Sequence, residues 1–281
     1  MRIFLALLSC SMLLACGTVR AQQPPARAYP GWTLVWADEF ERDGRPDSLS
    51  WGYETGFARN EEFQWYQPEN ARVEGGHLVI EGRRERKANP RYSAAGTDWR
   101  SRREFAEYTS ASLTTRGRRS WQYGRFEMRG RIDVRPGLWP AWWTLGVQGP
   151  WPANGEIDIM EYYRGMLLAN VAWGSERRNS AVWDDLRKPI TDFDPEWASR
   201  FHVWRMDWDE KAIRLYVDDV LLNETDLDQT FNRDAEGRNP LRQPHYMILN
   251  LAIGGTNGGD PSATEFPARF EVDYVRVYQR P

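Results

Sequence analysis

The sequence predicts an all-β protein, an antiparallel β-sandwich or jelly roll, and three observations support this prediction. Apolar and polar residues alternate with a period of two in several short stretches, as in half-buried strands. Gly-Gly and Asp-Asp pairs separate some of these stretches, which is typical of tight hairpins. Helical periodicity is hard to find, and residues 195–199 make at best one short turn. Many short strands with turns between them are typical of sandwiches.

The strands can be assigned in chain order. Residues 72–74 and 77–80 flank Gly75-Gly76 and predict the first hairpin. Residues 125–134 place apolar or small side chains at even positions and charged ones at every odd position, which predicts a strand with one buried face. Later strands are predicted at residues 203–208, 213–217, 220–222, 247–253 and 270–278.

Two polar stretches, residues 83–105 and 176–194, are too long for simple connections. Long ordered loops on a sandwich usually line a binding surface, so we expect these two to do so. The composition changes little from Gly31 onward, which predicts one domain over residues 31–281. With 37 basic and 40 acidic residues the net charge is −3, so nucleic acid is not an expected partner. We expect a monomer.

The N-terminal segment has the pattern of an export signal. An apolar run at residues 3–15 follows Arg2 and is too short to span a membrane. Cleavage after Ala21 would remove residues 1–21 as an ordinary signal peptide and leave residues 22–30 as a flexible linker. Export is therefore expected, to the outer membrane, the periplasm or the extracellular space.

The cysteines favour a second cleavage position. Leu13-Leu14-Ala15-Cys16 resembles a lipobox, so residues 1–15 would be removed and Cys16 lipidated. Cys10 and Cys16 are the only two cysteines, and an exported protein with an unpartnered cysteine needs a reason for it. This alternative makes the lipid on Cys16 the only expected contact with a membrane.

Three carboxylates alternate with apolar residues in the segment Glu156-Ile157-Asp158-Ile159-Met160-Glu161. Glu156 and Asp158 share a face of a regular strand because the side-chain period is two. Glu161 follows Glu156 by five residues and would point the other way. One extra residue near Ile159-Met160, a β-bulge, returns Glu161 to the face of the other acids. The spacing therefore predicts three acids on one surface.

Crowding three acids raises the pKa of at least one of them, and glycoside hydrolysis uses that outcome. One carboxylate attacks the anomeric carbon while the other carboxyl group protonates the leaving oxygen. The pair is about 5–5.5 Å apart in retaining enzymes and about 6.5–9.5 Å apart in inverting ones. The 15 tryptophans agree with this chemistry, because indole rings suit the apolar faces of sugars. The alternatives are a solvated acidic strand and a Ca²⁺ site.

The same segment resembles the signature of glycoside hydrolase family 16, in the bulged form shared by laminarinases, agarases and carrageenases. The resemblance covers nearly all of residues 31–281. Further similar blocks lie at residues 35–40, 60–66, 70–80, 123–127, 137–143, 247–255 and 272–278.

The resemblance implies a jelly roll with a concave substrate cleft and retaining, endo-acting hydrolysis of a β-linked polysaccharide. A β-1,3-glucan or a mixed β-1,3/1,4-glucan is the expected substrate. Glu156 would be the nucleophile and Glu161 the general acid/base, with Asp158 hydrogen-bonded between them. Catalysis would need no cofactor.

The resemblance also implies substrate-binding and metal positions, each of which has an ordinary structural alternative. Those expected to bind sugar are Asn60, Arg116, Trp139, Trp143, Trp151 and Trp173. Trp173 would fill the space of a histidine that many laminarinase-like members carry. Asp273 matches a position that often binds a structural calcium ion.

Two departures weaken a strict laminarinase assignment. That histidine is absent from residues 170–173, and residues 256–259 lack a tryptophan that laminarinases often place after Gly254-Gly255. An agarase- or carrageenase-type galactanase and a non-catalytic glycan-binding protein remain as alternatives.

Overall fold

The structure is a computed structural model that describes residues 27–281 except residue 235. The predicted signal segment 1–21, the lipidation site Cys16 and residues 22–26 of the predicted linker lie outside the described residues. Within the described part of the chain, no helix is long and apolar enough to cross a membrane.

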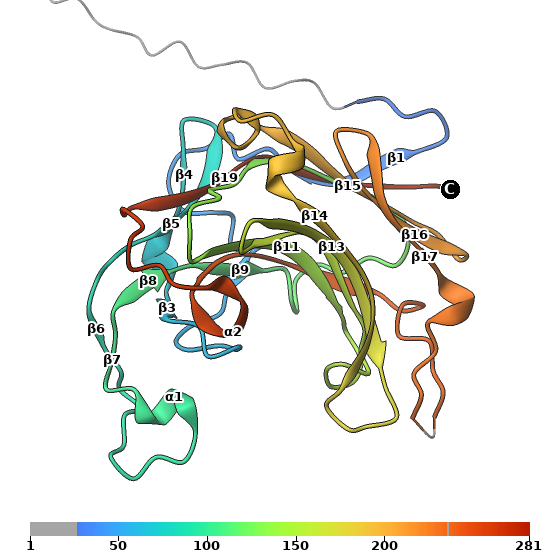
Figure 1. The fold of residues 1–281 in the computed structure, drawn as a ribbon. Coiled ribbons are helices and arrows are strands. Elements are labelled where there is room, and N and C mark those ends of the chain that lie inside the picture. The colour runs from blue at the N-terminus through green and yellow to red at the C-terminus, as the bar shows by residue number, and fades with distance from the viewer. Residues whose placement is uncertain (1–26, 235) are drawn as a thin grey trace, which may run out of the picture.

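Two antiparallel sheets pack face to face, which confirms the predicted sandwich (Figure 1). The eight-stranded sheet has the order β17-β16-β15-β10-β19-β5-β4, and β1 pairs with β19. Its strands are β1 (Thr33–Asp38), β4 (Ala71–Glu74), β5 (His77–Gly82), β10 (Gly124–Arg131), β15 (His202–Trp208), β16 (Ala212–Val217), β17 (Val220–Asp226) and β19 (Ala268–Gln279).

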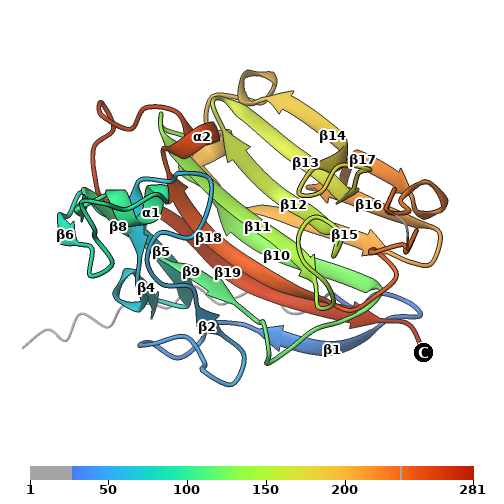
Figure 2. The same cartoon turned by 90° about the horizontal axis from the view of Figure 1, so that it is seen from below.

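The seven-stranded sheet has the order β14-β13-β12-β11-β18-β9-β2, and β12 lies in its interior (Figure 2). Its strands are β2 (Gly52–Tyr53), β9 (Ser112–Thr114), β11 (Leu138–Gly146), β12 (Glu156–Tyr163), β13 (Met166–Gly174), β14 (Ala181–Pro189) and β18 (His245–Ile253). Because neighbouring strands hold β12 on both sides, its side chains have fixed positions on the two faces of the sheet.

The remaining elements are short. Two small sheets pair β3 (Gln64–Tyr66) with β8 (Tyr108–Ser110) and β6 (Lys87–Ala88) with β7 (Phe105–Ala106). The α-helices are α1 (Trp99–Arg102) and α2 (Gly255–Gly258), and the 3₁₀ turns are η1 (Pro68–Asn70), η2 (Ile190–Asp192), η3 (Trp197–Ser199) and η4 (Leu227–Gln229).

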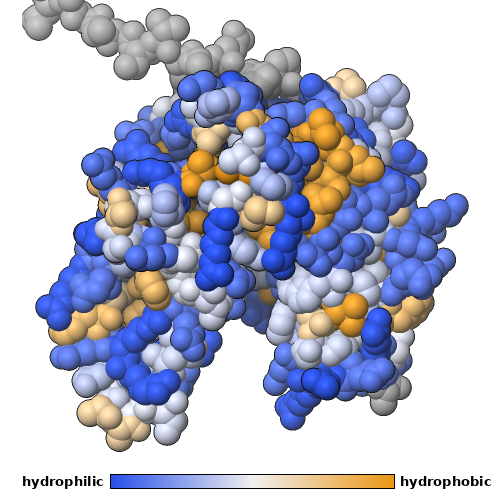
Figure 3. Space-filling view, viewed as in Figure 1, coloured by the Kyte–Doolittle hydropathy of each residue, from blue (hydrophilic) through white to orange (hydrophobic). Residues whose placement is uncertain are grey.

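The core lies between the two sheets and accounts for several of the tryptophans. Trp51, Trp142, Trp204 and Trp208 are fully buried, so the abundance of tryptophan is partly structural. The predicted strand at residues 247–253 is β18, and all of its residues are buried. The seven-stranded sheet curves away from the core, and its outer face opens into a hollow between two projecting lobes (Figure 3). One lobe carries β6, α1 and β7 (Figure 1).

Two segments differ from the sequence prediction. Residues 176–194 were expected to form a loop, but β14 occupies much of this stretch as an edge strand that carries charged side chains. Tyr29 was expected in a flexible linker. Its hydroxyl instead donates a hydrogen bond to Glu127, and its ring packs edge-on against Tyr278 with centroids 5.2 Å apart. The ordered domain therefore includes Tyr29.

Buried His245 makes folding sensitive to acid. The carbonyl of Pro240 can only accept, so Nε2–H donates to it at 3.1 Å, and Nδ1 accepts from the Thr144 hydroxyl at 3.0 Å. Burial lowers the pKa of His245 from 6.5 to about 4. Between these pH values the unfolded chain binds more protons than the folded one, so the stabilisation present above pH 6.5 is lost as the pH falls.

We expect His245 to contribute a loss of up to about 3 kcal/mol of folding free energy on acidification from pH 7 to 4. His245→Gln removes the titrating ring, so its unfolding free energy should fall less than that of the wild type. Urea unfolding at pH 7 and pH 4.5 measures both proteins, and the comparison cancels the other groups that titrate in this range. Equal losses in the two proteins would contradict the assignment.

Candidate active site

A β-bulge in β12 places the three acids on one face, as the spacing predicts. Asp158 lies opposite Asn170 of β13. Glu161 lies opposite Leu168, so three steps along β12 match two steps along β13. The pairing of β12 with β11 shifts at the same place. The intervening Ile157, Ile159 and Met160 are buried in the core. The acids therefore face the hollow of the curved sheet.

Two indole groups hold the two glutamates separately. Trp139 Nε1 donates to Glu161 Oε1 at 2.7 Å, and Trp151 Nε1 donates to Glu156 Oε2 at 2.5 Å. Trp139 is almost fully buried, whereas Trp151 is 42% exposed. Trp139 therefore positions an acid, while Trp151 also offers a ring surface on which a sugar can stack.

Burial is the largest influence on the acids, and it raises the pKa of each one. The pKa of Asp158 lies well above its usual range, because burial is joined by the charges of Glu156 and Glu161. Burial and the charge of Glu156 raise the pKa of Glu161 to about 7, although the Trp139 hydrogen bond opposes them. Hydrogen bonds from Trp151 and Asp158 lower the pKa of Glu156 against its burial. The site therefore favours ionised Glu156 beside protonated Glu161 at slightly acidic pH.

Arg59 is a site residue that sequence analysis missed. Its guanidinium lies 5.0 Å from the ring centroid of Trp143 and forms an ion pair with Glu54. The positive charge of Arg59 also lowers the pKa of Glu156. Trp143 is itself buried and donates to Asn250 Oδ1 at 2.7 Å. Arg59 thus covers Trp143, which was expected to present its ring to sugar.

Two predicted polar contacts lie at the surface. Asn60 is exposed in a left-handed conformation, with φ of 53°, and its carbonyl accepts from the Thr256 amide of α2. Arg116 is exposed and lies 5.6 Å from the ring centroid of Tyr246. A pocket of about 300 Å³ lies beside the apolar patch of Trp143 and Tyr246. It is lined by Gly52, Tyr53, Glu54, Thr114, Arg116, Arg118, Tyr246 and Ile248.

The expectation that Trp173 contacts substrate is wrong. Its side chain lies in the core between the sheets, because alternation along β13 turns it to the face opposite the acids. Asn170 of the same strand faces the acids instead and donates through Nδ2 toward Asp158 and Glu161. A lone asparagine within the apolar run 167–173 was the available signal.

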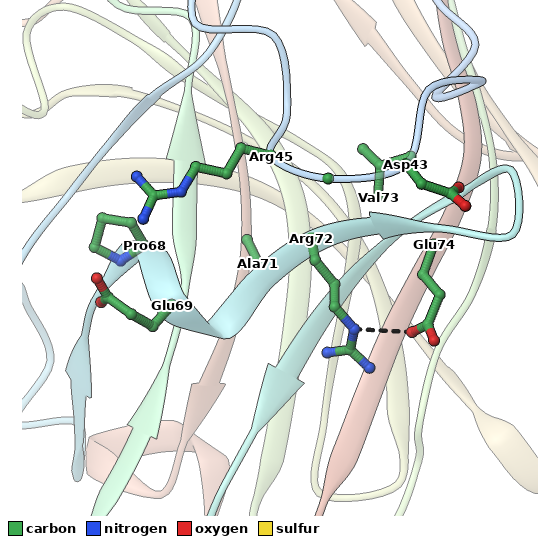
Figure 4. A pocket seen from close by; sticks show the side chains of 9 residues that line it. Asp43, Arg45, Pro68, Glu69, Ala71, Arg72, Val73 and Glu74 are labelled. Atoms are coloured by element: carbon green, nitrogen blue, oxygen red, sulfur yellow. Dashed lines mark hydrogen bonds and ion pairs between the residues drawn. The ribbon is translucent and has the colours of Figure 1, made fainter.

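A second pocket, of about 520 Å³, lies elsewhere, at the β4 edge of the eight-stranded sheet (Figure 4). Arg72 and Glu74 form an ion pair at its wall, with Nε and Oε2 2.8 Å apart. None of its lining residues belongs to β12. The pocket is therefore separate from the candidate active site.

The calcium interpretation of Asp273 does not fit the residues around it. Asp273 is buried, and its Oδ2 accepts from Arg129 Nη1 at 2.7 Å, so a guanidinium takes the place a cation would need. The nearby His77 Nε2 lies 3.8 Å from Oδ1. Among residues 27–234 and 236–281, no group of three acidic, histidine or cysteine side chains could hold a metal ion.

This pairing predicts stability that does not depend on calcium. Arg129→Met should lower the free energy of unfolding by about 2–4 kcal/mol, because it removes the cation beside a buried carboxylate. Thermal melts of both proteins should be unchanged by a calcium chelator. Arg129→Met combined with Asp273→Asn should recover part of the loss. A wild-type melting temperature that rises by several degrees with added Ca²⁺ would contradict the pairing.

Comparison with known proteins agrees with this geometry. The family model for "Glycosyl hydrolases family 16" matches residues 61–276. A beta-glucanase of Rhodothermus marinus is 39% identical over 97% of this chain and 91% of its own length. A solved structure from work on endo-acting O-glycanases of the human gut microbiota is 36% identical, with a TM-score of 0.82 over 92% of this chain and 94% of its own.

A third relative carries a bound oligosaccharide. A variant of SCLam, a non-specific endo-beta-1,3(4)-glucanase, is 34% identical, with a TM-score of 0.72 over 92% of this chain and 99% of its own, and holds 1,3-beta-D-cellobiosyl-glucose at its active site. The family model covers more than half of the chain, and the matched segment contains both indole-held glutamates. The chain therefore belongs to glycosyl hydrolases family 16.

Proposed function

We propose that the chain is a retaining endo-glycoside hydrolase that cleaves β-1,3 or mixed β-1,3/1,4-glucans. The observation that carries the proposal is the pair Glu156 and Glu161, which face the same hollow, are held by different indoles and differ in their electrostatic surroundings. The beta-glucanase from Rhodothermus marinus and the oligosaccharide-bound SCLam support a glucan substrate.

The reaction proceeds by two displacements. In the first, the Glu156 carboxylate attacks the anomeric carbon, the bond to the leaving oxygen breaks, and Glu161 gives that oxygen its proton. In the second, water attacks the same carbon, Glu161 takes a proton from the water, and the bond to Glu156 breaks. Asp158 is held in its protonated form and donates a hydrogen bond to Glu156, which stabilises the Glu156 carboxylate before it attacks and after it is released. Two inversions retain the anomeric configuration.

A mucin O-glycan or a galactan is a second candidate substrate. The O-glycanase-related structure has a TM-score of 0.82, whereas that of the glucanase SCLam is 0.72. The two departures from the laminarinase pattern, at residues 170–173 and 256–259, weaken a strict laminarin assignment. The carboxylates act in the same way on either substrate, and only the sugar rings bound beside them differ.

The substrate class is tested with laminarin, barley mixed-linkage glucan, a red-algal galactan and mucin O-glycans. New reducing ends from either glucan, with oligosaccharide rather than monosaccharide products, support the proposal. Cleavage of galactan or mucin glycans alone would change the substrate class and keep the hydrolase. Binding without product from any of the four, with the Glu156→Gln variant as blank, would favour a glycan-binding protein instead.

A further inference from the structure

Asn170 is a buried polar residue that has no role in the two displacement steps described above. It is 5% exposed and lies between apolar neighbours on β13. In register it faces Asp158 on one side and Asp185 of β14 on the other. A buried amide in such a strand needs hydrogen-bond partners, and its partners are the acids of the site.

The orientation of the Asn170 amide follows from its third partner. The backbone N–H of Leu186 lies 3.3 Å from Asn170 Oδ1 and can only donate. The amide oxygen must therefore face Leu186, and the NH₂ group faces the acids. Its nitrogen lies 3.5 Å from Asp158 Oδ2 and 3.4 Å from Glu161 Oε2.

These two contacts are long, and both are made by one nitrogen atom. Glu161 Oε1 already accepts a short hydrogen bond from Trp139, so Oε2 is the oxygen better placed to carry a proton. While Oε2 is protonated, the amide can turn toward Asp158. Once Glu161 has given up its proton, the amide can shorten its bond to Oε2, and charge-assisted bonds are the stronger ones.

We propose that Asn170 is a positioning residue that stabilises the Glu161 carboxylate formed when Glu161 gives its proton to the leaving group. This inference rests on the proposed function and adds to it a residue that does not touch the reacting atoms. Asn170 acts through Glu161, so its effect should depend on the protonation of that group.

Other titratable and charged groups lie near the acids and also influence their pKa values. Glu156, Asp158 and Tyr163 come from β12, and Arg187 comes from β14. Arg59 lies near Glu156. The Asn170 variants leave all of these groups unchanged, so a shift in the pH profile of those variants can be assigned to the change at residue 170.

The Asn170→Ala variant removes the N–H donor that faces Glu161, so the Glu161 carboxylate is harder to form. The alkaline limb of the kcat/KM profile should shift to higher pH by about one unit. The value of kcat should fall about tenfold with little change in KM. Asn170→Asp keeps the shape but adds negative charge, so it should move the limb further in the same direction. Carbon NMR titration of the Glu161 carboxyl group measures the same shift without turnover.

Asn223→Ala is the matched control. The Asn223 amide donates to the carbonyl of Ala169, next to Asn170 on the same strand, at 3.0 Å. Losing it should lower the melting temperature and leave the pH profile in place. If Asn170→Ala moves neither the limb nor the NMR titration beyond this control, Asn170 is only structural and the inference is wrong. If Glu156→Ala keeps full activity, the proposed function itself is wrong.

Discussion

Glu156→Ala is expected to lower kcat by about 10⁴-fold or more, because it removes the atom that bonds to the anomeric carbon. The shortened side chain leaves space for a small anion in its place. With an activated aryl glycoside and added azide, activity should partly return and yield the α-glycosyl azide, since azide then attacks from the side that Glu156 occupied. Product stereochemistry by NMR distinguishes this role from a general loss of structure.

The control for this prediction is Asp158→Asn, which keeps the shape of the side chain and supplies an N–H donor for the hydrogen bond that Glu156 accepts. It should reduce kcat far less than Glu156→Ala, and azide should have no effect on it. A β-configured azide from Glu156→Ala would show that the roles of Glu156 and Glu161 are exchanged. Unchanged hydrolysis in the absence of azide would remove Glu156 from the mechanism.

The fold and the acid cluster could be predicted from the sequence because both depend on local periodicity. Alternation at residues 125–134 shows which face of β10 is buried, without reference to its neighbours. The five-residue step from Glu156 to Glu161 required a bulge if the acids act together, and β12 contains it. β14 escaped prediction because an edge strand with mixed exposure resembles a polar loop.

The supporting residues could not be predicted in the same way, because their contacts join distant parts of the chain. Arg59 covers Trp143 through a contact that no local pattern encodes. Trp173 is one step out of phase with Asn170 and Ala172, so its face depends on the register of β13 against β12. Asp273 occupies the position expected for a calcium ligand, but its carboxylate accepts a hydrogen bond from Arg129 on the adjacent strand instead.

Glu161→Ala should affect substrates according to their leaving groups. Polysaccharide hydrolysis should fall by about 10²–10⁴-fold, since the departing sugar oxygen needs a proton. An aryl glycoside with a dinitrophenyl leaving group needs none, so its first step should survive and a burst of phenol should precede slow turnover. The glycosyl intermediate then accumulates because no base activates water, and azide should release it as the β-glycosyl azide.

The pH profile provides a second measurement of the same residue. The pKa of Glu161 is raised to about 7, and the first step needs its protonated form. Wild-type kcat/KM should therefore fall about tenfold per pH unit above neutrality. Glu161→Ala should lose this alkaline limb and keep the acidic limb that reports ionisation of Glu156. An alkaline limb that persists in Glu161→Ala would assign the proton to another group. Asp158, whose pKa lies well above its usual range, would then be the first to test.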